Sequence, residues 1–135
     1  MKAAHRARVW RRAGSRCEYC QLHQTDEPFP TFHVEHIVAR KHGGNDDPAN
    51  LALSCHRCNL GKSSNLSGRD ILTGDIVLLF HPRMQKWRDH FRWSGPKLVG
   101  RTKIGRATIA VLNINQPKQF RLRSILIKAS RFPPG

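Results

Sequence analysis

Two Cys-x-x-Cys pairs constrain the fold of this chain more than any other feature of its sequence. Cys17 and Cys20 form the first pair, and Cys55 and Cys58 form the second. Four thiolates at this spacing can close a tetrahedral zinc site that leaves no coordination position open for chemistry. We therefore expect a structural Zn²⁺ ion. A redox-active dithiol is the alternative, but it would account for only one of the pairs.

The segment between the two pairs predicts a structured insertion. It comprises residues 21 to 54, which is longer than the ~15 to 20 residues of a simple zinc ribbon. Apolar and polar residues alternate from Phe32 to Val38, which predicts a strand, and Leu51 to Leu53 predicts a returning strand. Residues 56 to 64 predict a helix directly after the second cysteine pair. The insertion and this helix contain most residues that can bind a metal or move a proton.

Four motifs in this block occur in a recognisable order. They are Val34-Glu-His-Ile-Val, His42-Gly-Gly, Pro48-Ala-Asn-Leu, and Cys55-His-Arg-Cys-Asn-Leu-Gly-Lys62. In order and spacing they resemble the HNH endonuclease family, also called the ββα-metal or His-Me finger nucleases, in the subtype that has a four-cysteine structural zinc. The resemblance implies a ββα-metal core that hydrolyses phosphodiester bonds.

The resemblance also implies a role for individual residues. His36 takes the position of the general base, and an imidazole exchanges protons near neutral pH. Glu35 and Asn59 take the positions of ligands for a catalytic cation, and their oxygen atoms suit Mg²⁺ or Mn²⁺. Asn50 takes the position of a residue that orients the base. Many relatives carry Asp and His at the two ligand positions, so this chain has an oxygen-rich variant of the motif.

Three further residues of the block are candidate accessory residues. His33 lies two residues before Glu35 and therefore faces the same side of the strand. It is either an extra ligand or phosphate contact, or a structural histidine. Lys62 and Ser63 follow Asn59 by about one helical turn, so they either reach a phosphate or a metal-bound water, or point into solvent.

The charge of the chain favours a polyanionic partner. The formal net charge is +15, and all nine acidic residues lie between Glu18 and Asp89. Both ends are therefore purely basic, and neutralising phosphates with such residues releases counterions. The alternative is a solvated basic surface or a ribosome-associated protein. The expected nucleic-acid contacts are Arg6, Arg11, Arg40, Arg83, Arg92, Arg101 and Arg106.

Outside the block, the sequence predicts a helix at residues 2–13 that ends at Gly14, with Ala3, Ala7 and Trp10 on one face. Residues 68–74 are rich in turn formers and predict a boundary. We therefore expect an HNH core with its N-terminal helix at 1–68 and a small basic α+β extension packed on it at 69–135.

Within the expected extension, a hairpin around residues 94–97 is expected, together with a helix capped by Thr102 and a helix starting at Pro117. The apolar stripe of that last helix would contain Phe120, Leu122, Ile125, Leu126 and Ala129. The aromatic residues Trp87, Phe91 and Trp93 either stack on bases or close a second small core, and we favour the core.

The sequence as a whole predicts an α+β metal-dependent endonuclease that acts on DNA, with double-stranded DNA as the expected partner. A non-catalytic zinc-finger module that binds nucleic acid, or a subunit of a larger phage or defence complex, is the alternative. No apolar run has the length of a signal peptide or a membrane span. We accordingly expect a cytoplasmic protein with no membrane partner.

Overall fold

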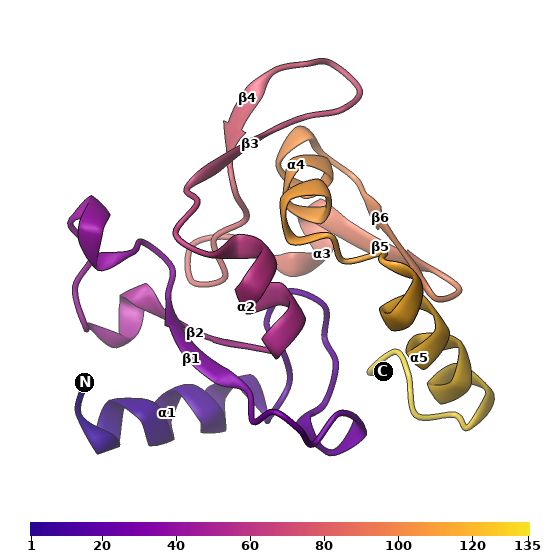
Figure 1. The fold of residues 1–135 in the computed structure, drawn as a ribbon, viewed down its shortest axis with the longest axis horizontal. Coiled ribbons are helices and arrows are strands. Elements are labelled where there is room, and N and C mark those ends of the chain that lie inside the picture. Colours follow the sequence, from indigo (N-terminus) through magenta and orange to yellow (C-terminus); the bar gives the residue numbers. More distant parts are fainter.

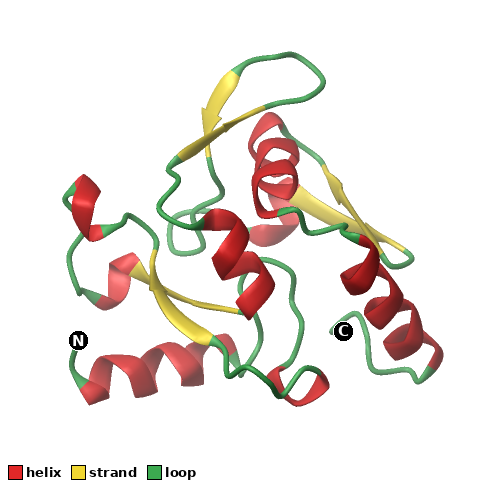
Figure 2. Cartoon of the chain, viewed as in Figure 1, coloured by secondary structure: helices red, strands yellow, loops and turns green.

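The computed structural model describes residues 1–135 and combines five α-helices with three separate two-stranded antiparallel sheets (Figures 1 and 2). The fold is therefore α+β, as the sequence predicts. No helix in it is both long enough and apolar enough to cross a bilayer.

The N-terminal half is built around the hairpin of β1 (His33–His36) and β2 (Leu51–Ser54), in which Val34 pairs with Leu53 and Glu35 with Ala52. Figure 1 shows this hairpin between helices α1 (Ala3–Ala13) and α2 (His56–Lys62). Three short 3-10 turns complete this half: η1 (Gln24–Asp26), η2 (Arg40–His42) and η3 (Pro48–Asn50). The expected strand-strand-helix order is confirmed.

The C-terminal half contains two further hairpins and three helices. Strands β3 (Ser67–Arg69) and β4 (Ile76–Leu78) pair with each other, as do β5 (Phe91–Ser94) and β6 (Lys97–Gly100). The helices are α3 (Trp87–His90), α4 (Lys103–Leu112) and α5 (Pro117–Lys128). The Thr102 side chain accepts a hydrogen bond from the Gly105 amide, as expected of an N-cap.

Two local expectations were wrong, one for helix α1 and one for helix α5. Helix α1 does end at Gly14 in the left-handed conformation, but its buried residue is Val9, and Ala3 and Ala7 are exposed. The segment at 68–74 does contain a turn at residues 71–73, and β3 overlaps only its first two residues. On α5, Phe120 and Ile125 of the expected apolar stripe are exposed, and the buried side chains are Gln119, Arg123 and Leu126.

One hydrophobic cluster of 18 buried residues runs through both halves of the chain. The indole of Trp87 donates a hydrogen bond to the Tyr19 carbonyl at 2.8 Å, and that of Trp93 donates to Gln21 Oε1 at the same distance. Phe91 is 1 % exposed. These aromatic residues therefore close a core, and they hold the C-terminal half against the first cysteine pair. The boundary after residue 68 stays a prediction.

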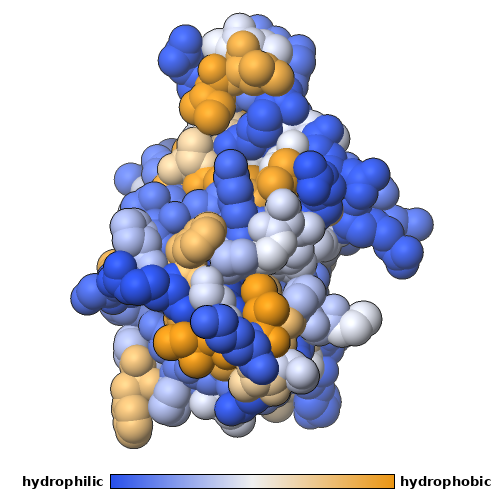
Figure 3. All heavy atoms as spheres, turned by 90° about the vertical axis from the view of Figure 1, so that its right-hand side faces the viewer, coloured by the Kyte–Doolittle hydropathy of each residue, from blue (hydrophilic) through white to orange (hydrophobic).

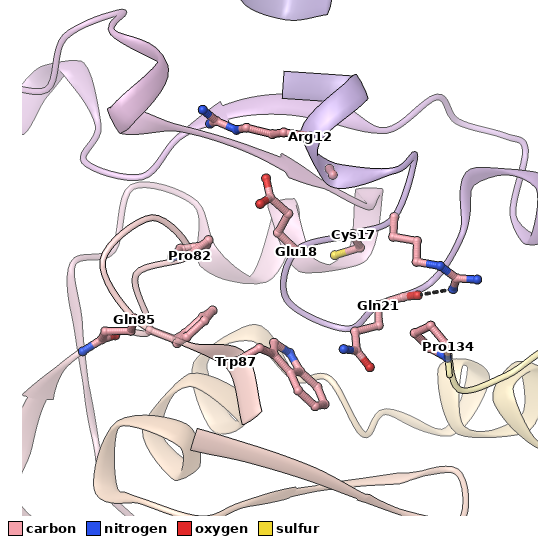
Figure 4. A pocket seen from close by; sticks show the side chains of 11 residues that line it. Arg12, Cys17, Glu18, Gln21, Pro82, Gln85, Trp87 and Pro134 are labelled. Atoms are coloured by element: carbon pink, nitrogen blue, oxygen red, sulfur yellow. Dashed lines mark hydrogen bonds between the residues drawn. The ribbon is translucent and has the colours of Figure 1, made fainter. Parts of the chain in front are cut away.

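A cavity of about 250 Å³ remains where the two halves meet. Figure 4 shows Arg12 and Glu18 on one side of it and Trp87 from α3, with Gln21 beside it, on the other. Arg83 forms an ion pair with Glu18 beside this cavity. The contact between the halves is thus partly polar.

The β3–β4 hairpin projects from the rest of the molecule and carries exposed apolar side chains. Ile71, Leu72, Ile76 and Leu78 are each about 70 % exposed or more. Figure 3 shows apolar surface gathered at the top of the molecule, where Figure 1 places this hairpin. Asp70, in the loop between β3 and β4, accepts hydrogen bonds from the Arg106 guanidinium at 2.8 and 3.0 Å and so joins the hairpin to α4.

Gly61 sets the contact between α2 and α4. A Cβ atom added at Gly61 would lie 2.6 Å from the carbonyl oxygen of Leu112, which leaves no room for a side chain. We expect Gly61→Ala to lower the free energy of unfolding by ~1–3 kcal/mol, because overpacking outweighs the better helix propensity of alanine. Denaturant unfolding measures this. Leu60→Ala on the same helix, where Leu60 is 60 % exposed, is the control and should change stability by only about 0.5 kcal/mol. A Gly61→Ala protein more stable than wild type would contradict the close contact between Gly61 and Leu112.

The Asp70–Arg106 pair should make stability depend on acidic pH. Hydrogen bonds from Arg106 above all, and also from Thr73, hold the pKa of the Asp70 carboxyl well below its usual range. Its contribution is therefore fully present above the ordinary pKa of about 4 and is lost as pH falls below it. We expect Asp70→Asn to lower the Tm at pH 7, and the difference from wild type to shrink toward pH ~3. The control is Asp75→Asn, at the exposed Asp75–Lys103 pair, which should leave Tm nearly unchanged. If both variants lowered Tm by the same amount at pH 7, the Asp70–Arg106 pair would not be the source of the pH dependence.

Candidate active site

The four cysteines come together as one metal-binding group. Their Sγ atoms all lie within 4.8 Å of one another, and all four side chains are buried. The Cys20 and Cys55 sulfurs are 3.7 Å apart and form no disulfide. The cluster joins the loop after α1 to the turn between β2 and α2. Its all-sulfur donor set fits a structural zinc ion.

The four thiols of the cluster cannot all be ionised without a cation between them. Although burial raises it, the pKa of the Cys17 thiol lies well below its usual range because Cys20, Cys55 and Cys58 donate hydrogen bonds to its thiolate. The same hydrogen bonds raise the pKa values of Cys55 and Cys58. Four buried thiolates repel one another, so full deprotonation needs a positive ion such as Zn²⁺ to neutralise them.

A second, open site lies between β1 and α2. It is a cleft of about 370 Å³, and its lining includes most of the predicted site residues: His33, Glu35, His36, Asn59 and Ser63. Arg40 from η2 also borders it. Strand β1 supplies His33 and Glu35 on one face, and α2 brings Asn59 to the same opening. Residues separated by more than 20 positions thus share one cleft.

The His36 ring is held by an acidic residue that sequence reasoning missed. Its Nε2 donates a hydrogen bond to Asp46 Oδ1 at 2.7 Å, and the ring is 21 % exposed. Arg40 donates to both carboxylate oxygens of Asp46 at 2.7 Å. The hydrogen bond from His36, followed by the charge of Arg40, lowers the pKa of Asp46. The only signal in the sequence was an acidic residue in the loop that follows Gly44.

Glu35 is buried at the inner end of the cleft and is 7 % exposed. Tyr19 Oη donates a hydrogen bond to its Oε1 at 2.5 Å, and Lys62 Nζ lies 3.8 Å from its Oε2. Burial raises the pKa of Glu35 to about 7, although the charge of Lys62 and the hydrogen bond from Tyr19 pull it down. A cation placed against this carboxylate would favour its ionised form further.

Lys62 is buried and bonded to the backbone at the end of β1. Its side chain is 2 % exposed, and its Nζ donates hydrogen bonds to the carbonyl oxygens of Ile37 at 2.9 Å and His36 at 3.3 Å. The alternative that it points into solvent was wrong, and a buried ammonium so engaged is not placed to bind a phosphate either. Lys62 instead joins α2 to the end of β1 and supports Glu35. Ser63 is exposed beside the cleft.

The two asparagines differ in their contacts. Asn50 Oδ1 accepts a hydrogen bond from the Val38 amide at 2.9 Å, and its Nδ2 donates to the carbonyl oxygens of Val38 and Asn45. It therefore ties the loop that carries Asp46 to the end of β1. The Asn59 side chain makes no hydrogen bond and is partly exposed in the cleft.

His33 and His56 pair with each other. Their Nε2 and Nδ1 atoms are 3.2 Å apart. Burial, and then the neighbouring His56, lower the pKa of His33. His33 thus lies beside the cleft in contact with the first residue of α2.

The predicted nucleic-acid contacts divide into two groups. Arg6, Arg11, Arg92 and Arg101 are exposed, and Arg40 is 64 % exposed although it pairs with Asp46. Arg83 and Arg106 are instead committed to internal ion pairs with Glu18 and Asp70. Breaking such a pair to bind a phosphate would leave a largely buried carboxylate uncompensated. We therefore leave these two arginines out of the nucleic-acid surface.

Comparison with protein-family models matches residues 17–65 to the family described as HNH endonuclease. These residues form an HNH domain. The match starts at the first zinc ligand and contains the cleft, so the domain includes both the cysteine cluster and the β1–β2–α2 unit. The comparisons with curated proteins and with solved structures found no match. The family is one of nucleases, so the domain supports a nucleic-acid-directed function.

Zinc should be required for the HNH domain to fold. Binding of a structural zinc ion contributes ~10 kcal/mol or more, which is comparable to the whole stability of a small domain. We expect Cys20→Ser to lose zinc and cooperative thermal unfolding, as monitored by metal analysis and circular dichroism. Arg57→Ala, which changes a residue between two zinc ligands, is the control and should keep both. A Cys20→Ser protein with the wild-type Tm would show that the cluster is not a folding requirement.

Proposed function

We propose that this protein is a metal-dependent endonuclease that hydrolyses DNA phosphodiester bonds in the cleft between β1 and α2. The observation that carries the proposal is that His36, Glu35 and Asn59 line one open cleft within the HNH domain. A binding module has no need to gather a base and two oxygen ligands around one opening. The resulting ends would carry a 5′-phosphate and a 3′-hydroxyl, by analogy with the family.

His36 is the proposed general base, and its hydrogen bond decides which ring nitrogen acts. Nε2 carries the proton that is donated to Asp46, so the lone pair that accepts a proton from water is on Nδ1. Nδ1 makes no hydrogen bond within the protein. Asp46 is ionised at neutral pH, because its pKa is lowered, and its charge stabilises the imidazolium that forms. Asp46 therefore acts as a positioning residue.

Glu35 and Asn59 would hold the catalytic cation. Glu35 Oε2 accepts no hydrogen bond, and the Asn59 amide oxygen is equally unengaged, so each can offer an oxygen to Mg²⁺ or Mn²⁺. When bound, such a cation neutralises charge on the scissile phosphate and the leaving oxygen. Tyr19 and Lys62 hold the Glu35 carboxylate in place from the protein side.

The proposed substrate surface is basic. Arg6 and Arg11 lie on α1, and Arg92 and Arg101 lie on and after the β5–β6 hairpin. With a net charge of +15, backbone contacts would give affinity without sequence preference. We propose DNA, expected to be double-stranded, as the partner that brings a phosphate into the cleft.

The decisive experiment compares wild type and His36→Ala on supercoiled plasmid with Mg²⁺, with Mn²⁺ and with no divalent cation. Removing a general base is expected to slow cleavage by ~10²–10⁴-fold. His42→Ala is the matched control, because His42 is an exposed histidine in the following turn with no hydrogen bond from its side chain. It should cleave like wild type.

Two outcomes would contradict the proposal. DNA that is retarded on a gel but not nicked in either cation would make the protein a binding module. Nicking that appears only when a cell extract is added would make it a subunit of a larger complex. Zinc content and Tm, measured on every variant, separate loss of chemistry from loss of fold.

A further inference from the structure

His33 and His56 form a contact that the proposed cleavage chemistry does not use. His33 Nε2 and His56 Nδ1 are 3.2 Å apart, and the ring centroids are 5.5 Å apart with the planes tilted by 32°. Neither side chain has any other hydrogen-bond partner in the structure. Both rings are partly exposed, and His33 lines the cleft. The two rings therefore present their nitrogens to each other at a place that solvent and ions can reach.

Both histidines are held in place by their backbones. His33 is the first residue of β1 and pairs with Ser54 of β2. His56 directly follows Cys55, whose sulfur belongs to the four-cysteine cluster, and it is the first residue of α2. A ligand that bridges the two rings would link the strand to the helix without moving either. Little conformational freedom of the two histidines would then be lost on binding, which favours affinity.

The separation of the two nitrogens matches that of two ligands on one ion. Imidazole nitrogens bind zinc at ~2.0–2.1 Å, and at tetrahedral angles two of them lie about 3.3 Å apart. A shared proton in an N–H···N hydrogen bond would also bring them this close. Both arrangements need both rings, but only a metal ion keeps further coordination positions open around it.

We propose that His33 and His56 form a second metal site, separate from the four-cysteine site, for a borderline divalent transition metal ion. Neutral imidazoles select Ni²⁺, Co²⁺, Cu²⁺ or Zn²⁺ over Mg²⁺. No third histidine, cysteine or carboxylate lies close enough to join them, because Glu35 is turned toward Tyr19 and Lys62. The ion therefore keeps open coordination positions that face the cleft. That a phosphate oxygen takes one of these positions rests on the proposed function; metal binding itself does not.

Nickel is the probe that tests the site. Calorimetric titration of Ni²⁺ into the zinc-loaded full-length protein is expected to show a site whose affinity falls at least about tenfold in His33→Ala and in His56→Ala, since each removes one of two protein ligands. His42→Ala should bind nickel like wild type. His36→Ala should as well, so nickel binding and DNA cleavage can fail independently of each other.

A second measurement needs no variant. Paramagnetic Ni²⁺ should broaden the imidazole proton resonances of His33 and His56 at substoichiometric amounts, and should leave those of His42 sharp. The proposal is overturned if wild type binds nickel no more tightly than the His33→Ala protein, or if the broadening falls on other histidines. Zinc analysis before and after titration shows whether nickel has replaced zinc in the cysteine cluster; binding explained by such replacement also overturns it.

Discussion

The convergence of four buried thiolates is the interaction on which the rest of the structure depends. It joins two segments separated by 34 residues and fixes the place where β2 ends and α2 begins. Helix α2 has only seven residues, too few to be stable by its own hydrogen bonds. Because Cys55 and Cys58 hold its first turn, the helix keeps Asn59 and Lys62 over the β1–β2 hairpin. The geometry of the cleft is thus a consequence of a site that performs no chemistry.

Two neighbouring residues of β1, Glu35 and His36, both line the cleft but are supported by different groups. Lys62 and Tyr19 provide Glu35 with a positive charge and a hydrogen-bond donor. Asp46, which is itself bound by Arg40, fixes the His36 ring. A carboxylate and an imidazole that are neighbours in sequence therefore have separate supports.

Local patterns in the sequence correctly predicted the structural features that depend only on neighbouring residues. The end of α1 at Gly14, the N-cap at Thr102 and the hairpin around residues 94–97 were all predicted, because turn and cap preferences are properties of a few adjacent residues. That Glu35, His36 and Asn59 would lie in the same cleft was expected only from the resemblance to a family. The roles of these residues stay a proposal.

Contacts across the fold could not be predicted in this way. The burial of Lys62 depends on the carbonyl oxygens at the end of β1, and strand β3 exists because Ser67 to Arg69 meet β4. Arg83 and Arg106 look like phosphate contacts in a basic sequence, yet each pairs with an acidic residue 65 or 36 positions away. Such pairs appear only once the chain is folded.

The first residues of the chain contact the loop that carries Asp46. The amino group of Met1 lies 3.7 Å from Asp46 Oδ2, and the His5 ring hydrogen-bonds to the Asp46 carbonyl. Asn50 holds the same loop from the side of β1. The loop is therefore fixed by α1 on one side and by the hairpin on the other, and the carboxylate that orients His36 has little freedom to move. Since α1 is itself packed against β2, the orientation of the proposed base depends on contacts made outside the matched HNH segment.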